Sequence, residues 1–184
     1  MTEFEGVQCH KVVDLGLSQI YLSAEKLANI RTWFRSDDLA SFEPLPVHDF
    51  GNGRLTLTDG HSRAFAAYKA GVTHVPVVYD TDDMITSALG QLLYKQDLVW
   101  CDRLGLHNVR DLENRILSSA DYQRLWLDRC KRAYHLLAQT DEEKRDILAG
   151  LCPTRYLYGA SQDLSILYFE DEREQTFAVS NTIL

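Results

Sequence analysis

The stretch RLTLTDGHSRAFAAYKAGVTHVPVVY, Arg54–Tyr79, predicts a strand, a sharp turn, a helix and a second strand in succession. Leu55 and Leu57 alternate with polar neighbours, which is typical of a half-buried strand. An Ala-rich helix is expected to begin at His61, and Gly71 is the residue expected just beyond its end. The segment HVPVVY then has the β-branched composition of a buried strand.

The polar residues of this stretch gather where the first strand turns into the helix. Gly60 permits a sharp turn, and the first-turn amides of the helix, from His61 to Arg63, point outward with the positive end of the helix dipole. Arg63 adds a fork of donors suited to phosphate oxygens, and Asp59 supplies a carboxylate able to hold Mg²⁺ or position a hydroxyl. Two interpretations stay open: an anion site including Ser62, or a helix cap, a turn and a surface arginine.

Working outward, the preceding residues extend the pattern into a small mixed sheet with helices. Residues 11–23 are rich in Val, Leu and Ile and predict one or two strands. Ser23 is expected to cap a helix over residues 24–34, where apolar residues recur at helical spacing. Residues 44–60 predict two short strands joined at an Asn-Gly turn.

Beyond residue 83 the pattern becomes helical. A helix is predicted over residues 83–96, and a second, with one long apolar stripe, is predicted from a cap at Ser119 to about residue 139. A third is predicted over residues 141–149, and residues 164–181 predict a hairpin with a charged turn.

The predicted fold class is therefore α+β, in two parts. Residues 1–83 are expected to form a mixed sheet with helices, and residues 84–184 a helical extension with a C-terminal hairpin, packed on the first part. The hydrophobic content of 45% over 184 residues suits one sizeable core. Three tryptophans, Trp33, Trp100 and Trp126, are expected in the core.

Composition limits the classes of function. The net charge is -8 and the sequence pI is about 5.2, whereas a nucleic-acid-binding module normally has a basic face. A nucleic-acid partner is therefore not expected. No apolar run approaches the roughly 20 residues that span a bilayer, and no signal peptide is recognised, so a cytoplasmic protein without membrane association is expected. The four cysteines lack metal-ligand spacing and are interpreted as reduced thiols: Cys9, Cys101, Cys130 and Cys152.

Residues 45–77, LPVHDFGNGRLTLTDGHSRAFAAYKAGVTHVPV, resemble the ParB/sulfiredoxin superfamily. In that superfamily a strand runs into a Gly-containing turn and a helix that cradle a nucleotide phosphate. The resemblance covers about residues 12–79. Its strongest part is TDGHSRAFAAYKAG followed by VPVVY, which is similar to the family pattern Asp-Gly-His-x-Arg, an Ala-rich helix, Gly and a closing strand.

The superfamily contains several chemistries, and this sequence departs from each. Sulfiredoxins have a nucleophilic Cys directly after the turn Gly, where this chain has His61. Partitioning ParB proteins carry Gly-Glu-Arg-Arg at the turn and follow it with a basic helix-turn-helix domain, whereas this chain has Gly-His-Ser-Arg at the turn and an acidic helical part without the expected basic surface. Free-serine kinases carry Asp-Gly-His-His-Arg, which resembles Asp59, Gly60, His61 and Arg63 but not Ser62.

The kinase resemblance implies roles for individual residues. Arg63 and the amides of Gly60, His61 and Ser62 would bind the phosphates of ATP, ADP or CTP, with Mg²⁺ near Asp59. Catalytic roles would fall to Asp59, His61 and an acidic residue at the start of the first helix, for which Glu25 is the candidate. Glu25 is equally consistent with a first-turn residue that favours the helix dipole, and His61 with a hydrogen-bonded turn residue.

Two functions from different classes follow. The first is phosphotransfer from a nucleotide to a small hydroxyl compound such as free serine, for which a cleft bordered by both Glu25 and Asp59 is expected. The alternative is a non-catalytic nucleotide-responsive or DNA-associated module, or a nuclease-like protein, for which a basic surface patch is expected. For the first, residues 84–103 are expected to flank the turn of residues 59–63 and leave a cleft of about 300 Å³ or more.

Overall fold

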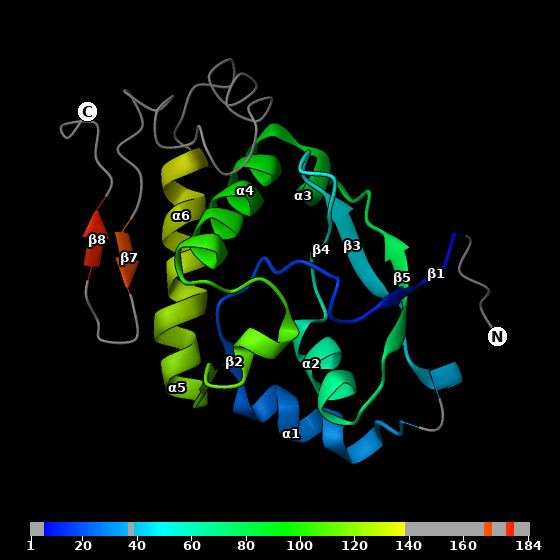
Figure 1. Ribbon diagram of the computed structural model, residues 1–184. Coiled ribbons are helices and arrows are strands. Elements are labelled where there is room, and N and C mark those ends of the chain that lie inside the picture. Colours follow the sequence, from blue (N-terminus) through cyan, green and yellow to red (C-terminus); the bar gives the residue numbers. More distant parts are fainter. Residues whose placement is uncertain (1–5, 37–38, 139–167, 171–175, 179–184) are drawn as a thin grey trace.

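The computed structural model, which describes residues 6–36, 39–138, 168–170 and 176–178, contains a four-stranded mixed sheet. Its strand order is β1-β5-β3-β4 (Figure 1). Strand β5 (His74–Tyr79) pairs parallel with β3 (Leu45–Asp49) and antiparallel with β1 (Gln8–Lys11), while β4 (Leu55–Leu57) pairs antiparallel with β3. The predicted α+β class is confirmed.

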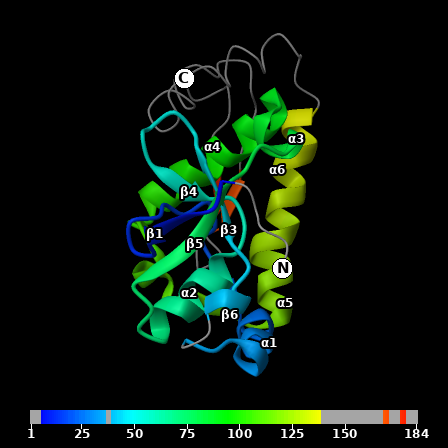
Figure 2. The same cartoon turned by 90° about the vertical axis from the view of Figure 1, so that its right-hand side faces the viewer.

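Two pairs of helices accompany the sheet. Helix α1 (Ala24–Trp33) packs against α2 (His61–Lys69), and α4 (Ala88–Arg103) packs against α6 (Asp128–Ala138). In Figure 1 α4 lies between α6 and the strands, and Figure 2 shows α6 along the right-hand side of the turned view. The shorter elements are the 3₁₀ helices Leu39–Ser41 (η1) and Val109–Leu112 (η2), helix α3 (Asp83–Thr86), helix α5 (Ser119–Tyr122), the π-helix Gln123–Leu127 (η3), and the parallel pair β2 (Leu22–Ser23) and β6 (Ile116–Leu117).

The last described elements are two short strands. Strand β7 (Tyr168–Glu170) pairs antiparallel with β8 (Thr176–Ala178), within the region where a hairpin was predicted. The predicted helix over residues 141–149, and Cys152, lie outside the described residues.

Local signals set the ends of α1 and α2 as predicted. The Ser23 hydroxyl accepts a hydrogen bond from the Lys26 amide at 3.3 Å and so caps α1. Helix α2 ends at Lys69, and Gly71 follows with φ of +81°, in the left-handed region that glycine enters without steric cost.

The segment between β1 and β2 departs from the predicted strands. Residues 12–21 are largely buried, but Gly16 forms only an isolated bridge with Thr56. The Gly16 amide donates to Leu55 O at 2.8 Å, and a Cβ on Gly16 would lie 2.7 Å from Thr56 Oγ1. The apolar composition therefore reflects burial of an irregular segment that passes very close to β4.

The two predicted C-terminal helices that fall within the described residues are both interrupted. Ser87, with ψ of 153°, ends α3 and caps α4 by accepting from the Gly90 amide at 3.1 Å. Farther along, the π-helix of residues 123–127 separates α5 from α6. The cap of α5 is Ser118, whose hydroxyl accepts from the Asp121 amide, so the predicted cap at Ser119 was wrong by one residue.

One hydrophobic core joins the two parts proposed from the sequence, because it includes residues from Val12 through Leu137. Trp100 and Trp126 lie in it as predicted, at 1% and 6% exposed. Trp33 does not, since it is 44% exposed at the end of α1. In the described part of the chain, every helix is too short or too polar to cross a bilayer.

A buried ion pair joins α4 to α6. Arg129, 2% exposed, donates from Nη2 to Asp97 Oδ1 at 2.7 Å, and its guanidinium lies over the rings of Trp100 and Trp126. Burial raises the pKa of Asp97, and the charge of Arg129 opposes that rise. Removing either partner would leave a buried charge unpaired, which is far more costly than losing a surface pair.

Gly90→Ala is expected to destabilise the protein, although the same change in an ordinary helix stabilises it by about 1 kcal/mol. A Cβ at this position would lie 1.7 Å from the Met84 carbonyl oxygen, so the α3–α4 corner would have to open. Overpacking of this kind costs about 1–3 kcal/mol. Chemical denaturation should show the loss.

Gly105→Ala is the control for backbone strain without overpacking. Gly105 has φ of +68°, and a Cβ there would have no atom of the described residues within 4 Å. A stabilised Gly90→Ala protein would contradict the close packing of the α3–α4 corner.

Candidate functional site

The turn between β4 and α2 is built around Gly60. Its φ of +75° and ψ of 14° are left-handed, a conformation that costs other residues about 1–2 kcal/mol. A Cβ here would lie 2.7 Å from Leu45 Cδ2 and 3.1 Å from Arg63 Nη2. Gly60 is thus required both by the backbone angle and by the two side chains that close over it.

The turn leaves the first amides of α2 without partners in the helix. Ala64 is the first residue of α2 whose amide bonds back, to Gly60 O at 2.8 Å. Gly60 has no side chain to cap the amides of residues 61–63, and no other described residue accepts from them. Unpaired first-turn amides together with the helix dipole favour an anion at this end.

His61 is a buried, neutral donor at the start of α2. It is 3% exposed, and the Ser18 amide donates to its Nε2 at 3.1 Å. Because an amide only donates, Nε2 accepts and the neutral ring carries its proton on Nδ1. Nδ1 is buried and finds no partner among the described residues. Burial lowers the pKa of His61 to about 4, against an opposing contribution from Asp59 and with a smaller lowering from Lys26.

A cleft of about 250 Å³ opens above this turn. Residues 59–63 form one side of it, and α1 forms the other with Lys26, Asn29, Ile30 and Trp33. Gln19 completes the lining. The expectation that residues 84–103 flank the turn as a wall was wrong, because none of them lines the cleft, and the volume is smaller than the expected 300 Å³.

Helix α1 can form this wall because it packs directly on α2. Lys26, Asn29, Ile30 and Trp33 recur at i, i+3, i+4 and i+7, which places them on one face of α1. The apolar spacing of this helix was recognised from the sequence, but the polar members of the face were missed. The spacing of Lys26, Asn29 and Trp33 in the sequence could have indicated that these residues share one face of the helix.

The charged groups of the cleft are two cations and one carboxylate. Arg63 Nη1 donates to the Glu43 carboxylate at 2.9 Å and to the Glu43 carbonyl oxygen at 3.0 Å, so part of its charge is already compensated. Lys26 is exposed and forms no ion pair with a described residue; its ammonium lies 5.6 Å from the Tyr122 ring centroid. Lys26 is therefore the cation most available to a ligand.

Among the described residues that line this cleft, Asp59 is the only carboxylate, and it is exposed. No group of three or more His, Cys, Asp or Glu able to hold a metal occurs in the described part of the chain. Mg²⁺ commonly binds through one or two carboxylates together with substrate phosphates and water. Asp59 fits that mode, in which a bound nucleotide supplies the other ligands, and does not fit a cage made by the protein alone.

Glu25 lies outside the cleft lining. Its Oε2 accepts a hydrogen bond from the Ser119 hydroxyl at 2.7 Å, at the first turn of α5. The cleft is thus bordered by Asp59 but not by Glu25. A catalytic role for Glu25 stays a prediction that requires the side chain to leave Ser119.

Helix α4 supports the turn from outside the cleft. Tyr94 donates from its hydroxyl to Thr58 O at 3.2 Å, and the Thr58 hydroxyl donates to Asp80 Oδ2 at 2.5 Å. The Thr58 amide donates to Pro46 O at 3.1 Å. The residue before Asp59 is therefore held through its amide, its side chain and its carbonyl. Burial raises the pKa of Tyr94, so its hydroxyl stays protonated as a donor.

Comparison with known proteins adds little to this geometry. No protein-family model matches the chain, and no curated protein matches it. Among solved structures, protein Atu1540 from Agrobacterium tumefaciens is similar at 14% sequence identity, with a TM-score of 0.39, over 77% of this chain and 84% of that one.

The buried His61 should make stability depend on pH. Its folded pKa of about 4 lies below the unfolded value of about 6.5, so the unfolded state binds more protons between these values. The contribution of His61 is therefore full above pH 6.5 and falls as the pH is lowered toward 4, by up to about 3 kcal/mol. Denaturation at several pH values should show this slope.

His61→Gln should remove this part of the slope, whereas His74→Gln, at an exposed position on β5, should keep it. The same slope in both variants would contradict the burial of an uncharged His61.

Proposed function

We propose that the cleft between α1 and the 59–63 turn binds the phosphate groups of a nucleotide. The observation that supports this most directly is the set of amides of residues 61–63, which no described residue accepts from, facing a helix that contributes the cation of Lys26. Arg63 adds a second cation, and His61 lines the same cleft as a neutral side chain. Convergent amides and cations are the usual means of holding phosphate oxygens.

We propose further that the protein transfers a phosphoryl group from ATP or ADP to a small hydroxyl compound such as free serine. Charge that develops on a transferring phosphoryl group is stabilised by fixed donors, and the amides of residues 61–63 are fixed by α2. Asp59, the carboxylate among the described residues of the lining, would orient the acceptor hydroxyl or share Mg²⁺ with the phosphates. When bound, Mg²⁺ would neutralise charge on the phosphate oxygens.

A second candidate is a nucleotide-responsive module without catalysis. It is favoured by the position of Glu25, which is hydrogen bonded to Ser119 outside the cleft and leaves Asp59 as the one carboxylate in the described lining. Binding without turnover needs the amides and cations alone. DNA association and nuclease activity are less favoured by the net charge of -8.

Nucleotide binding should raise the melting temperature. A ligand that binds only the folded state, at 100 times its Kd, adds about 2.7 kcal/mol, which corresponds to roughly 5–10 °C for a chain of this size. Lys26→Gln should weaken the binding of ATP and of tripolyphosphate roughly tenfold or more, because a charge-assisted hydrogen bond is lost.

Lys131→Gln is the matched control, because Lys131 is an exposed lysine on α6 outside this cleft. If neither ATP, ADP, CTP nor tripolyphosphate changes the melting curve of the unmodified protein, the phosphate-site proposal fails.

A turnover assay should distinguish the phosphotransferase from the non-catalytic module. It should also show whether Asp59 or Glu25 contributes to catalysis. With ATP or ADP, Mg²⁺ and a panel of free amino acids and sugars, nucleotide conversion should require one particular acceptor. Asp59→Asn should then slow turnover by about 10²–10⁴-fold, the usual contribution of a positioned carboxylate, while Glu25→Gln should change it little.

Loss of turnover in Glu25→Gln alone would assign the base to Glu25 instead. Tight nucleotide binding without conversion, for every acceptor tested, would favour the non-catalytic module.

A further inference from the structure

Trp33, the last residue of α1, is a large aromatic side chain that is unusually exposed. Trp33 is 44% exposed, whereas Trp100 and Trp126 are 1% and 6% exposed. Trp33 also lines the cleft described above. A large exposed aromatic side chain at a cleft marks a place where a ligand can cover apolar surface.

Among the described residues, the ring contact of Trp33 is with Phe34. The two rings meet in a T-shaped contact, with centroids 6.2 Å apart and an interplanar angle of 88°. Phe34 in turn contacts Phe42 at 5.6 Å between ring centroids. Within the described residues no ring stacks face to face on Trp33. A planar ligand ring can therefore stack there while the Phe34 contact keeps the indole in place.

The cleft also has a polar end and an aromatic end. Lys26 and His61 line the same cleft, and the charge of Lys26 contributes to the lowered pKa of His61. Trp33 follows seven residues later, roughly 10 Å along the helix axis at about 1.5 Å per residue. Asn29 lies between them on the same face, with an amide side chain that can both donate and accept.

We infer that Trp33 stacks on the base of a nucleoside phosphate whose phosphate groups occupy the 59–63 turn. The ligand class is thereby a nucleotide, as opposed to inorganic phosphate or a sugar phosphate. This inference rests on the phosphate site proposed above. Stacking on an aromatic side chain tolerates different bases, so ATP and CTP should both profit from Trp33.

The test compares ligands with and without a base. Calorimetric titration of the full chain with ATP and with tripolyphosphate, which has no base or ribose, should show tighter binding of ATP by about 5- to 150-fold. Trp33→Ala should reduce ATP affinity toward that of tripolyphosphate and leave tripolyphosphate binding unchanged. Trp33→Phe should keep part of the advantage, because a smaller ring still stacks.

A spectroscopic signal gives independent support. ATP should quench the tryptophan fluorescence of the unmodified protein, tripolyphosphate should not, and Trp33→Phe should lose the quenching, since the other two tryptophans are buried. Tyr134→Ala, at an aromatic residue 41% exposed on α6, is the matched control and should bind both ligands normally.

Equal affinities of the unmodified protein for ATP and tripolyphosphate, or an unchanged ratio in Trp33→Ala, would overturn the role of Trp33 and leave the phosphate site standing. Failure of both ligands to bind would overturn the phosphate site and this inference together.

Discussion

The left-handed backbone of Gly60 is the constraint on which the candidate site depends. At this residue the chain changes direction from β4 into α2. Leu45 and Arg63 lie so close to its α-carbon that a side chain has no room. Because glycine also lacks a capping group, the same residue that permits the turn leaves the amides of residues 61–63 without a partner among the described residues. The geometry of the turn and the unpaired amides therefore have one cause.

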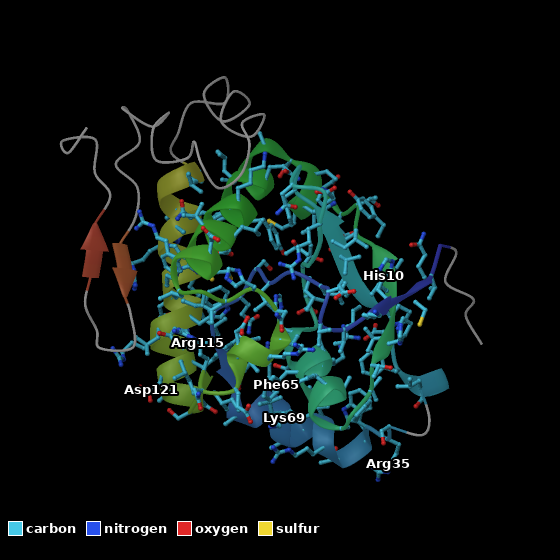
Figure 3. The ribbon with its side chains drawn as sticks, in the orientation of Figure 1. His10, Arg35, Phe65, Lys69, Arg115 and Asp121 are labelled. Atoms are coloured by element: carbon cyan, nitrogen blue, oxygen red, sulfur yellow. The ribbon has the colours of Figure 1, made fainter. Side chains whose placement is uncertain are left out.

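Contacts on both sides of the turn keep this geometry in place. Ser18 bonds to His61 Nε2 through its amide and to Leu57 O through its hydroxyl, so it joins the end of β4 to the start of α2. Tyr94 and Asp80 hold Thr58. At the opposite end of α2 Lys69 pairs with Glu113, which ties the helix to the residues after η2 (Figure 3 labels Lys69 and Phe65 on α2). A turn held at several points can present its amides without rearranging, which is what electrostatic preorganisation requires.

The sequence predicted best what depends on adjacent residues. The Ser23 cap, the start of α2 at His61 and the left-handed Gly71 each follow from local chemistry, and all three were predicted. The break at Ser87 was also a local feature, but the apolar spacing of residues 83–96 continues across it and indicated one helix. The turn of residues 59–63 was identified as a polar cluster because its residues are consecutive.

What the sequence did not predict depends on contacts between distant residues. Glu25 is held by Ser119, 94 positions later, and nothing near Glu25 indicates that partner. Trp33 was expected in the core because tryptophan is usually buried, yet α1 ends where that face meets the cleft.

Helix α1, and not α4, forms the wall of the cleft, because side chains of α4 make contacts elsewhere. Tyr94 on α4 is committed to Thr58, and Asp97, one turn later, is committed to Arg129 on α6. This helix therefore supports the turn and anchors α6, and α1 faces the open side of the turn. The described lining of the cleft comes from residues 19–63, whereas residues after 83 contribute burial and support. One wall of the cleft and part of the support of the turn thus come from different parts of the chain: side chains of α1 line the cleft, whereas Tyr94 on α4 holds the residue before Asp59.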